Sequence, residues 1–475
     1  MMTECNSRQL HFSNSGRRKV TARFDGGHLT SDAGGLLVCE TDKRLGLTRR
    51  LAACFSDHRN PDLIEHSVRD LIAQRVFALA LGYEDLSDRD RLRSDPLPAL
   101  LVGKADVTGQ DRRRLRDKGR ALAAASSLGR LGRSRPQEAP TDRYRRIGAD
   151  SAAMDALLRD LYVEARDQPP RRAVLDLDAA DDPLHGRQEG RFFHGYYRSY
   201  CYLPLYVFCG DRLLLARLRT ADSDPGAGVA DELTPPISRI GSAWPDTEIV
   251  LRADSGFARE ETMSWCEEAG VFYVFGLARN PRLQQMLAKA LHESRRRHAA
   301  TGRPSRRYRG FGYRTLKTWS RSRRVVGKAE HLAKGPNPRF AVANLPSAAI
   351  GKRDLYEKLY CPRGETENRI EEMQLALLSD RTSSGTIAAN QLRPYFSGFA
   401  YVLLEGLRRL GLKGTGRARL RCDSLRLRFL KVAGRIRIAH RRIWISLPSA
   451  YPFRAAFAGI VDRLAGIPVH HPSPG

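Results

Sequence analysis

The chain has 475 residues, of which 81 are Lys or Arg and 53 are Asp or Glu, so its formal net charge is +28. This length predicts two to four folding units, and an apolar fraction of 41% supplies a large core, which excludes a disordered tail. Such an excess of positive charge predicts a polyanionic partner, above all nucleic acid, because binding releases the counterions that a polyanion condenses.

The sequence carries no signal for export or for a membrane. No run approaches the roughly 20 apolar residues of a spanning helix, and the start, Met1–Cys5, lacks the charged-then-apolar pattern of a signal peptide. The eight cysteines are scattered without a CxxC pair, which argues against a disulfide framework or a structural zinc site. We therefore expect a cytoplasmic protein with no membrane partner.

The first 145 residues predict a mainly helical region after a short opening hairpin at Lys19–Leu29. Thr30–Asp32 offers capping side chains to a helix that carries Leu37, Thr41 and Leu45 along one stripe. Asn60–Asp62 opens a second helix. Its apolar residues recur at helical spacing: Ile64, Val68, Leu71, Ile72, Val76 and Leu79.

An Arg-rich stretch follows between Gln110 and Arg135, with few large apolar residues. A charge run of this kind is usually a solvated face. Because the rest of the chain needs an anionic partner, the sequence leaves open whether the stretch is also an arm that contacts DNA.

From about residue 170 the pattern changes to alternating strands and helices. Two strands with alternating residues flank the hairpin signal Gly210-Asp211. The predicted elements of this region are strands at Ala173–Leu177, Tyr202–Cys209, Arg212–Arg219, Ile249–Leu251 and Val271–Leu277, and a helix at Ala258–Ala269. Their order predicts an α/β fold, a mixed sheet with helices on both faces.

Two later segments are strongly basic. Arg295–Lys334 holds fourteen Lys or Arg against one acid, with interleaved aromatic residues, and Arg408–Arg442 holds thirteen against one. In the second segment, Ile436–Ile438 and Ile443–Ile445 alternate like a basic β-hairpin. Basic grooves with aromatic platforms are suited to holding a nucleic-acid backbone and splayed bases.

Acidic residues crowd the end of the predicted strand at 173–177, in Asp176-Leu177-Asp178 and the following Asp181-Asp182. Alternation puts Asp176 and Asp178 on one face, where two bare carboxylates would repel each other. A divalent cation removes that repulsion, and hard oxygen ligands suit Mg²⁺ or Mn²⁺. The alternatives are solvated acids at a strand-to-loop transition and the DxD motif of glycosyltransferases.

A second candidate is Asp254, which follows the apolar strand Ile249–Leu251 and precedes a Gly turn. The carboxyl edge of an open α/β sheet is where sites usually lie, although Asp254 could instead only cap the next helix.

The third candidate is Glu367, because Tyr360, Arg363 and Glu367 share one face if the segment is helical. Pro362 would then have to lie in the first turn, and a surface ion pair is the alternative.

Taken together, three carboxylates on separate elements of a +28 protein can hold two metal ions about 3.5–4 Å apart. Such ions activate water or a 3′-hydroxyl and stabilise the leaving oxygen of an in-line displacement at phosphorus. The combination predicts phosphodiester chemistry on DNA.

At these residues the sequence resembles the DDE transposases of the bacterial IS4-like superfamily, most closely the IS1380 family. The resemblance covers essentially the whole chain, through the motifs Phe24–Gly27, Leu29–Gly35, Asp178, Ala253–Phe257 and Arg363–Arg369. It implies an RNase H-like catalytic core and cut-and-paste transposition of an insertion sequence. The expected partners are double-stranded DNA, as terminal inverted repeats and target DNA, and a second copy of the chain in a dimeric synaptic complex.

The resemblance also assigns roles to residues. It implies that Asp178, Asp254 and Glu367 are catalytic and bind two Mg²⁺ or Mn²⁺ ions, with Asp176 as a possible alternative ligand. Other residues are expected to contact DNA: Tyr360 and Arg363 at phosphates near the cut, Trp319 by stacking on a flipped base, and its basic neighbours Lys317, Arg321, Arg323 and Arg324. A core position for Trp319 is the alternative. We expect the protein in the bacterial cytoplasm, associated with the nucleoid.

The sequence departs from the superfamily pattern at two positions. Gln374 stands where the signature has Lys, and Ala180 stands where Asp-x-Thr is usual. These departures leave the expected metal ligands intact, but they concern the contacts to DNA ends.

Five segments are expected: 1–145, a mainly helical DNA-binding region; 146–283, the first part of the catalytic core; 284–347, a basic β-rich insertion; 348–410, the second part of the core with the Glu367 helix; and 411–475, a basic C-terminal region. Three other functions compete with the transposase: an inactive or domesticated DNA-binding descendant, a stand-alone RNase H-like nuclease or resolvase, and a nucleotide-sugar transferase that uses Asp176 and Asp178.

Overall fold

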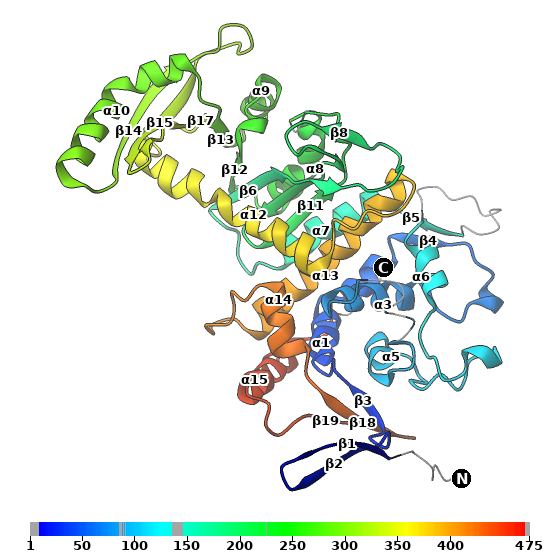
Figure 1. Cartoon of the computed structure of the whole chain (residues 1–475). Coiled ribbons are helices and arrows are strands. Elements are labelled where there is room, and N and C mark those ends of the chain that lie inside the picture. The colour runs from blue at the N-terminus through cyan, green and yellow to red at the C-terminus, as the bar shows by residue number, and fades with distance from the viewer. Residues whose placement is uncertain are drawn as a thin grey trace. The chain divides into compact units, whose positions relative to one another are not determined.

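The computed structural model describes residues 9–84, 88, 90, 92–134, 146–224 and 226–470, and it divides into two compact units (Figure 1). The terminal unit combines Met1–Ala149 with Phe399–Gly475, and the central unit is Asp150–Gly398. The expected first and last segments thus belong to one unit. Cys5 and Arg135 lie outside the described residues.

No disulfide joins the cysteines that the structure describes. Of the helices in the described ranges, none has both the length and the apolar character needed to cross a membrane.

The terminal unit is built from short helices and strands. Its N-terminal elements are β1 (Leu10–Ser15), β2 (Arg18–Ala22), β3 (His28–Thr30), α1 (Gly35–Leu45), α2 (Leu47–Ala52), β4 (Phe55–Asp57), the 3₁₀ turn η1 (Pro61–Leu63), α3 (Val68–Ala80), α5 (Pro96–Val102), η2 (Leu115–Asp117), α6 (Ala125–Leu131) and β5 (Ile147–Ala149). Its C-terminal elements are the end of α13 (Ile387–Gly411), α14 (Cys422–Leu425), η7 (Arg426–Leu430), β18 (Gly434–Ala439), β19 (Arg442–Ser446) and α15 (Arg454–Ala465).

The hairpin expected at Lys19–Leu29 is wrong in its limits. The opening hairpin is β1–β2, whose turn holds Gly16 at a φ of +62°, a conformation that favours glycine. β3 instead pairs with β18, which lies about 400 residues later in the chain, so no local pattern could have revealed its partner. The basic hairpin predicted around residues 436–445 is confirmed as β18–β19.

The two predicted helices exist, but their starts differ from the expectation. No side chain caps α1; Asp32 is instead buried, and its carboxylate accepts from the Tyr83 hydroxyl and pairs with Lys431. Asn60 caps only a 3₁₀ turn, and α3 begins later at Val68, where Ser67 and Asp70 form a capping box.

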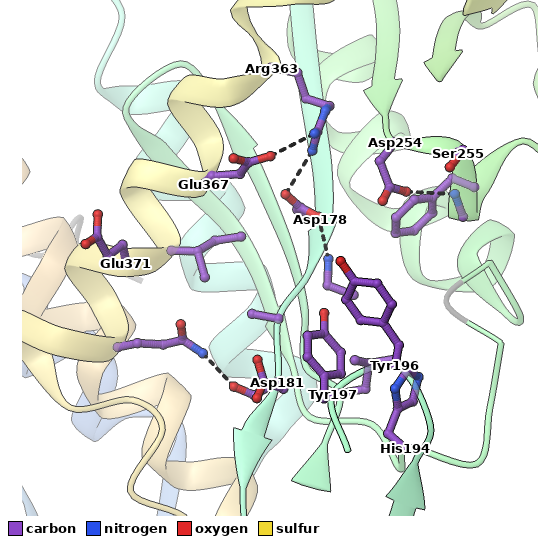
Figure 2. A pocket seen from close by; sticks show the side chains of 17 residues that line it. Asp178, Asp181, His194, Tyr196, Tyr197, Asp254, Ser255, Arg363, Glu367 and Glu371 are labelled. Atoms are coloured by element: carbon purple, nitrogen blue, oxygen red, sulfur yellow. Dashed lines mark hydrogen bonds and ion pairs between the residues drawn. The ribbon is translucent and has the colours of Figure 1, made fainter. Parts of the chain in front are cut away.

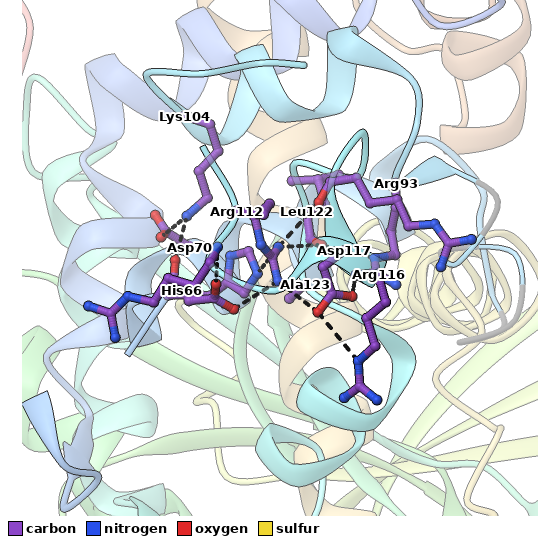
Figure 3. Close-up of polar contacts among 12 residues, drawn as sticks. His66, Asp70, Arg93, Lys104, Arg112, Arg116, Asp117, Leu122 and Ala123 are labelled. Atoms are coloured by element: carbon purple, nitrogen blue, oxygen red, sulfur yellow. Dashed lines mark hydrogen bonds and ion pairs between the residues drawn. The ribbon is translucent and has the colours of Figure 1, made fainter. Parts of the chain in front are cut away.

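Part of the Arg-rich stretch is internal to the terminal unit (Figure 3). Arg112 donates to His66 at 2.7 Å and to Glu65 at 3.0 Å, and Arg93 donates to Asp117 at 3.1 Å. Burial, with nearby Lys104 and Arg112, lowers the pKa of His66 to about 3, so this imidazole is neutral and accepts. The other arginines of the stretch are exposed, as expected of a solvated face: Arg113, Arg114, Arg116, Arg120, Arg130 and Arg133.

The central unit is organised by one large mixed sheet. Its strand order is β11-β10-β6-β12-β13-β17-β15-β14, with β16 paired to β15. The strands are β6 (Arg172–Ala179), β10 (Leu205–Cys209), β11 (Arg212–Arg217), β12 (Glu248–Ala253), β13 (Phe272–Leu277), β14 (Ser305–Tyr313), β15 (Arg323–Leu332), β16 (Gly335–Pro336) and β17 (Arg339–Ala343). All five predicted strands lie in it, and the mixed α/β architecture is confirmed.

Helices cover both faces of this sheet, and a small second sheet of β7 (Asp182–Pro183), β8 (Phe192–His194) and β9 (Ser199–Tyr202) lies apart from it. The helices and helical turns are α7 (Ser151–Glu164), α8 (Val229–Ala243), η3 (Ser255–Phe257), α9 (Glu260–Glu268), α10 (Pro281–Thr301), α11 (Lys352–Asp354), η4 (Leu355–Tyr360), η5 (Cys361–Arg363), α12 (Gly364–Glu371), η6 (Glu372–Ala376) and the first part of α13. Residues Lys352–Ala376 are helical without a break.

Alternation along the strands decides which side chains meet which helices. Leu251 belongs to the core that packs against α7, α8, α9 and α10, whereas Val250 belongs to the core under η4. On β6, Leu175 and Leu177 face the first core. Asp176 and Asp178 therefore face the side of the sheet that carries the 352–376 helical segment.

The segment 284–347, the expected basic β-rich insertion, combines part of a helix with strands of the central sheet. It begins inside α10, a helix of 21 residues, and its strands β14, β15 and β17 extend the central sheet beyond β13 (Figure 1). The link is the antiparallel pairing of β17 with β13, which joins Val274 to Ala343 and Leu277 to Phe340. This pairing spans about 65 residues, so it could not be read from local alternation.

Candidate active site

The parallel register of β6 and β12 places Asp178 beside Asp254. Leu177 pairs with Ala253, and each acid is the next residue along its strand. Adjacent parallel strands end at the same edge of a sheet, so both carboxylates lie at that edge, on the face covered by the helical segment. The backbone pairing thus brings together two acids separated by 76 positions in the sequence.

The 352–376 helical segment supplies the third carboxylate. Arg363 ends a 3₁₀ turn that accommodates Pro362, and Glu367 lies one turn further on in α12. Both line a cavity of about 590 Å³ together with Asp178 and Asp254 (Figure 2). The structure therefore brings the three predicted acids to one cavity.

Arg363 bridges two of the acids. Its guanidinium lies 3.1 Å from the Asp178 carboxylate and 2.7 Å from that of Glu367. Burial raises the pKa of Asp178 to about 7; the Arg363 charge opposes this shift, and the charges of Asp254 and Glu367 add to it. The acids around Asp178 thus disfavour its ionised form, and the Arg363 guanidinium is the cation that favours it.

Asp254 both caps a turn and lines the cavity. Its carboxylate accepts from the Gly256 N–H at 2.8 Å and so caps the short turn Ser255–Phe257. It also lines the cavity. The cap holds the carboxylate in a fixed orientation at the strand end.

Asp176, the alternative ligand, is engaged elsewhere. Both of its carboxylate oxygens accept from Arg252 on the neighbouring strand, and its side chain is 3% exposed. Arg252 also donates to the Leu359 carbonyl at 2.6 Å, which ties β12 to the helical segment. The repulsion between Asp176 and Asp178 suggested a bound cation. The charge of Asp176, however, is already compensated by Arg252.

Tyr360, which was expected to contact DNA, packs against β13. A Cβ atom at Gly276 would come within 2.5 Å of the Tyr360 hydroxyl and 3.1 Å of the Ser255 nitrogen. Glycine at this strand position therefore lets both the phenol and the Asp254 turn approach the sheet. The sequence offered no motif for this role of Gly276.

The residues expected to bind DNA around Trp319 fall into two groups. Trp319 is 4% exposed and packs edge-to-face on Tyr313 in the core, so its ring offers no free face to a base, and the core alternative holds. Arg323 is buried against Glu260 and Glu267, and Arg324 donates to the carbonyls of Leu345 and Ile350. Lys317 and Arg321 are exposed, although Arg321 pairs with Glu267 at 3.0 Å.

Gln374, one of the two departures from the family pattern, lines the cavity. Its amide donates to the Asp181 carbonyl and to the Asp182 carboxylate at 3.1 Å. Asp182 is fully buried, and burial raises the pKa of this carboxyl well above its usual range. A neutral amide donor suits a neutral acid, whereas a lysine here would favour an ionised one.

Sequence reasoning missed part of the cavity wall. The further side chains are His194, Tyr196, Tyr197 and Glu371, together with Asp181, which the sequence placed among the crowded acids without a role. The signal that could have revealed some of them is the aromatic run between Phe192 and Tyr202, which is too dense for an ordinary surface loop.

The donor chemistry of the cavity suits a divalent cation, because Asp178, Asp254 and Glu367 offer hard oxygen ligands that repel one another. Among the described residues, however, no three His, Cys, Asp or Glu side chains are close enough together to hold one ion. Arg363 lies between Asp178 and Glu367 in this arrangement.

No curated protein sequence matches this chain. A cryo-EM structure of the piggyBac transposase synaptic complex with hairpin DNA is similar at 10% identity and a TM-score of 0.39, over 83% of this chain and 78% of that one. The family model described as Transposase DDE domain group 1 matches residues 12–469. Because that match spans nearly the whole chain, the protein belongs to the Transposase DDE domain group 1 family and is a DNA-cutting enzyme of the transposase class.

Proposed function

We propose that this protein is the transposase of a bacterial insertion sequence, and that it cuts and rejoins DNA at terminal inverted repeats. The observation that carries the proposal is the meeting of Asp178, Asp254 and Glu367 at one cavity in a chain of this family. We assign the catalytic role to these three acids. The resemblance of the motifs to the IS1380 family supports the assignment to an insertion sequence.

An RNase H-like core is part of this proposal. It is supported by the antiparallel hairpin β10–β11 on one side of β6 and the parallel strands β12 and β13 on the other. It is further supported by the position of the acids at the carboxyl ends of β6 and β12.

Two Mg²⁺ or Mn²⁺ ions held by the three acids would supply an activated water or 3′-hydroxyl and stabilise the leaving oxygen. The protein's own residues prepare the site. The Gly256 N–H fixes the Asp254 carboxylate, and the strand register keeps Asp178 beside it. We propose that, in the absence of DNA, the Arg363 guanidinium compensates the charges of the acids. When DNA binds, Arg363 turns to a backbone phosphate, whose oxygens its forked donors match.

The substrate side of the proposal rests on charge. A net charge of +28 favours double-stranded DNA, both as element ends and as target. A dimer in the synaptic complex is proposed from the family resemblance alone. The inactive or domesticated alternative differs from the transposase only in whether the DNA is cut.

Strand cleavage tests this function. The purified chain is incubated with duplexes that carry the element's own ends, in Mg²⁺ or Mn²⁺ and in EDTA. We expect nicks at the element ends that require the metal and are absent from a duplex of scrambled end sequence. Binding of the ends without cleavage in either metal would instead identify an inactive, DNA-binding descendant.

We expect the arginines of the basic hairpin β18–β19 to contribute to the salt dependence of DNA binding. Arg437 pairs across the strands with Trp444, and the guanidinium groups of Arg437 and Arg442 lie 5.5 and 5.7 Å from its ring. Replacing Arg435, Arg437 and Arg442 by glutamine should reduce the slope of log affinity against log salt by about 0.9 per lost phosphate contact.

The slope is measured by fluorescence anisotropy of labelled duplex DNA at several salt concentrations. Arg239→Gln on α8 is the matched control, because Arg239 is half-exposed and already paired with Asp160 at 2.7 Å. An unchanged slope in the triple variant would remove this hairpin from the DNA-binding surface.

A further inference from the structure

The segment Gly190–Tyr202 forms the hairpin β8–β9, and its composition is unusual. It holds six aromatic residues, Phe192, Phe193, Tyr196, Tyr197, Tyr200 and Tyr202, together with two arginines and a histidine, and no acidic residue. We call it the aromatic hairpin. Nothing in the catalytic assignment of the three acids accounts for it.

Four of the six rings of the aromatic hairpin are exposed, whereas Tyr202 is buried and Tyr197 is half-buried. Tyr196 is 84% exposed, Phe193 57%, Tyr200 44% and Phe192 41%. Single exposed apolar residues are ordinary, but several adjacent rings on one short hairpin mark a binding surface.

Contacts within the hairpin hold these rings in place. Phe193 and Tyr200 are directly opposite each other across the strands, with ring centroids 5.6 Å apart. Arg191 stacks over Tyr200 at 4.1 Å, and Tyr196 meets Tyr197 edge-on at 5.0 Å. The rings therefore form a prearranged surface, and a ligand would lose little entropy in ordering them.

The tip of the hairpin is shaped by a backbone conformation that is rare for a residue with a side chain. Arg198 has a φ of +53°, and its N–H donates to the His194 carbonyl at 2.8 Å. This closes the turn at Gly195–Arg198, from which Tyr196 and Tyr197 project.

The aromatic hairpin is continuous with the catalytic cavity. His194, Tyr196 and Tyr197 line the same cavity as Asp178 and Asp254. In Figure 2 the two tyrosines lie on one side of Asp178, and Arg363 and Glu367 lie on the other. Whatever binds the rings is therefore adjacent to the bond that the acids act on.

We propose that the aromatic hairpin binds unpaired nucleobases of the DNA next to the bond that is cut, with Tyr196 as the principal stacking residue. The proposal rests on the proposed function, because it takes DNA as the substrate of the cavity. Every base has a π-face, and stacking on an aromatic side chain tolerates any sequence. The flanking Arg191 and Arg198, with no acid in the segment, suit the phosphates on either side of such a base. Tyr196 is a positioning residue, since it holds the strand and does not act on the phosphorus.

The test uses 2-aminopurine, whose fluorescence falls when it stacks. The probe is placed opposite a mismatch beside the cleavage position, and the full-length chain is added in EDTA so that no strand is cut. We expect the unmutated protein to quench the probe. Tyr196→Ala should lose the quench and bind the mismatched DNA roughly 5- to 150-fold more weakly, with a much smaller loss for fully paired DNA.

A conservative variant makes the result specific. Tyr196→Phe keeps the ring and should keep both the quench and the affinity. Because Tyr196 is so exposed, its alanine variant should unfold at the unmutated temperature.

Equal quenching and equal affinity in Tyr196→Ala, in a protein that still cuts element ends, would overturn this inference and leave the proposed function standing. A changed oligomer mass in Tyr196→Ala with unchanged DNA binding would also overturn it, since the rings would then pack on a second copy. An unmutated protein that binds no DNA would overturn both.

Discussion

Asparagine in place of Asp254 should abolish strand cleavage while leaving affinity for DNA unchanged or slightly raised. Asparagine keeps the oxygen that accepts from the Gly256 N–H, so the turn at Ser255–Phe257 is preserved. It removes the negative charge that a divalent cation needs, and metal catalysis contributes several kcal/mol, which corresponds to a rate loss of about 10³-fold or more. Binding rests on Lys and Arg side chains, so losing one acid does not weaken it.

Asp178→Asn and Glu367→Gln should show the same separation of cleavage from binding. Glu365→Gln is the matched control for the helix: Glu365 is an exposed acid on α12, two positions from Glu367 and turned to a different side of the helix. Cleavage is measured as nicked product per bound complex, with binding measured separately by anisotropy. Retained cleavage in Glu367→Gln together with its loss in Glu371→Gln would make Glu371, which lines the same cavity, the third acid.

Removing either partner of the Asp176–Arg252 ion pair should strongly destabilise the central unit. The side chains are 3% and 10% exposed, and the pair links β6 to β12 and, through the Leu359 carbonyl, to the helical segment. An uncompensated buried charge costs about 3–5 kcal/mol. For a unit of this size that corresponds to a fall of roughly 6–20 °C in its melting temperature.

The measurement is the thermal transition of Asp176→Ala, Arg252→Met and the double variant Asp176→Leu/Arg252→Met. We expect the double variant to recover much of the lost stability, because an apolar pair of similar volume leaves no buried charge unpaired. Asp178→Asn, in contrast, should melt no lower than the unmutated protein, since it removes a carboxylate that burial and two neighbouring acids disfavour. If Asp176→Ala kept its melting temperature and lost cleavage, Asp176 would be the first catalytic acid.

The sequence alone predicted five strands of the central sheet, β6 and β10 to β13, and the acids near the ends of β6 and β12. Buried strands have apolar runs, as at Ala173–Leu175 and Ile249–Leu251, and each of these runs is followed within a few residues by an acid near the strand end. The helical stripe that includes Arg363 and Glu367 was equally local. These features depend on neighbours within a few residues, and periodicity records such neighbours.

Sequence could not separate Asp176 from Asp178, because both lie on one face of one strand. What distinguishes the two acids is Arg252, the residue before the last one of β12. The register of the sheet places Arg252 opposite Asp176, where it forms an ion pair. Charge counts failed for the same reason at Arg112 and Arg323, which are buried in ion pairs and do not face solvent. A count of charges does not record which of them have partners.

Only the tertiary structure decided how distant segments combine. The pairing of β17 with β13 makes the strands of the expected insertion part of the central sheet, and the pairing of β3 with β18 brings elements from both terminal regions into one unit. The aromatic hairpin lines the cavity because the tertiary structure brings it close to the ends of β6 and β12 and to α12. Local patterns fix which residues form a helix or a strand and which side chains share a face, whereas strand partners and buried ion pairs depend on residues that are close in space and far apart in the chain.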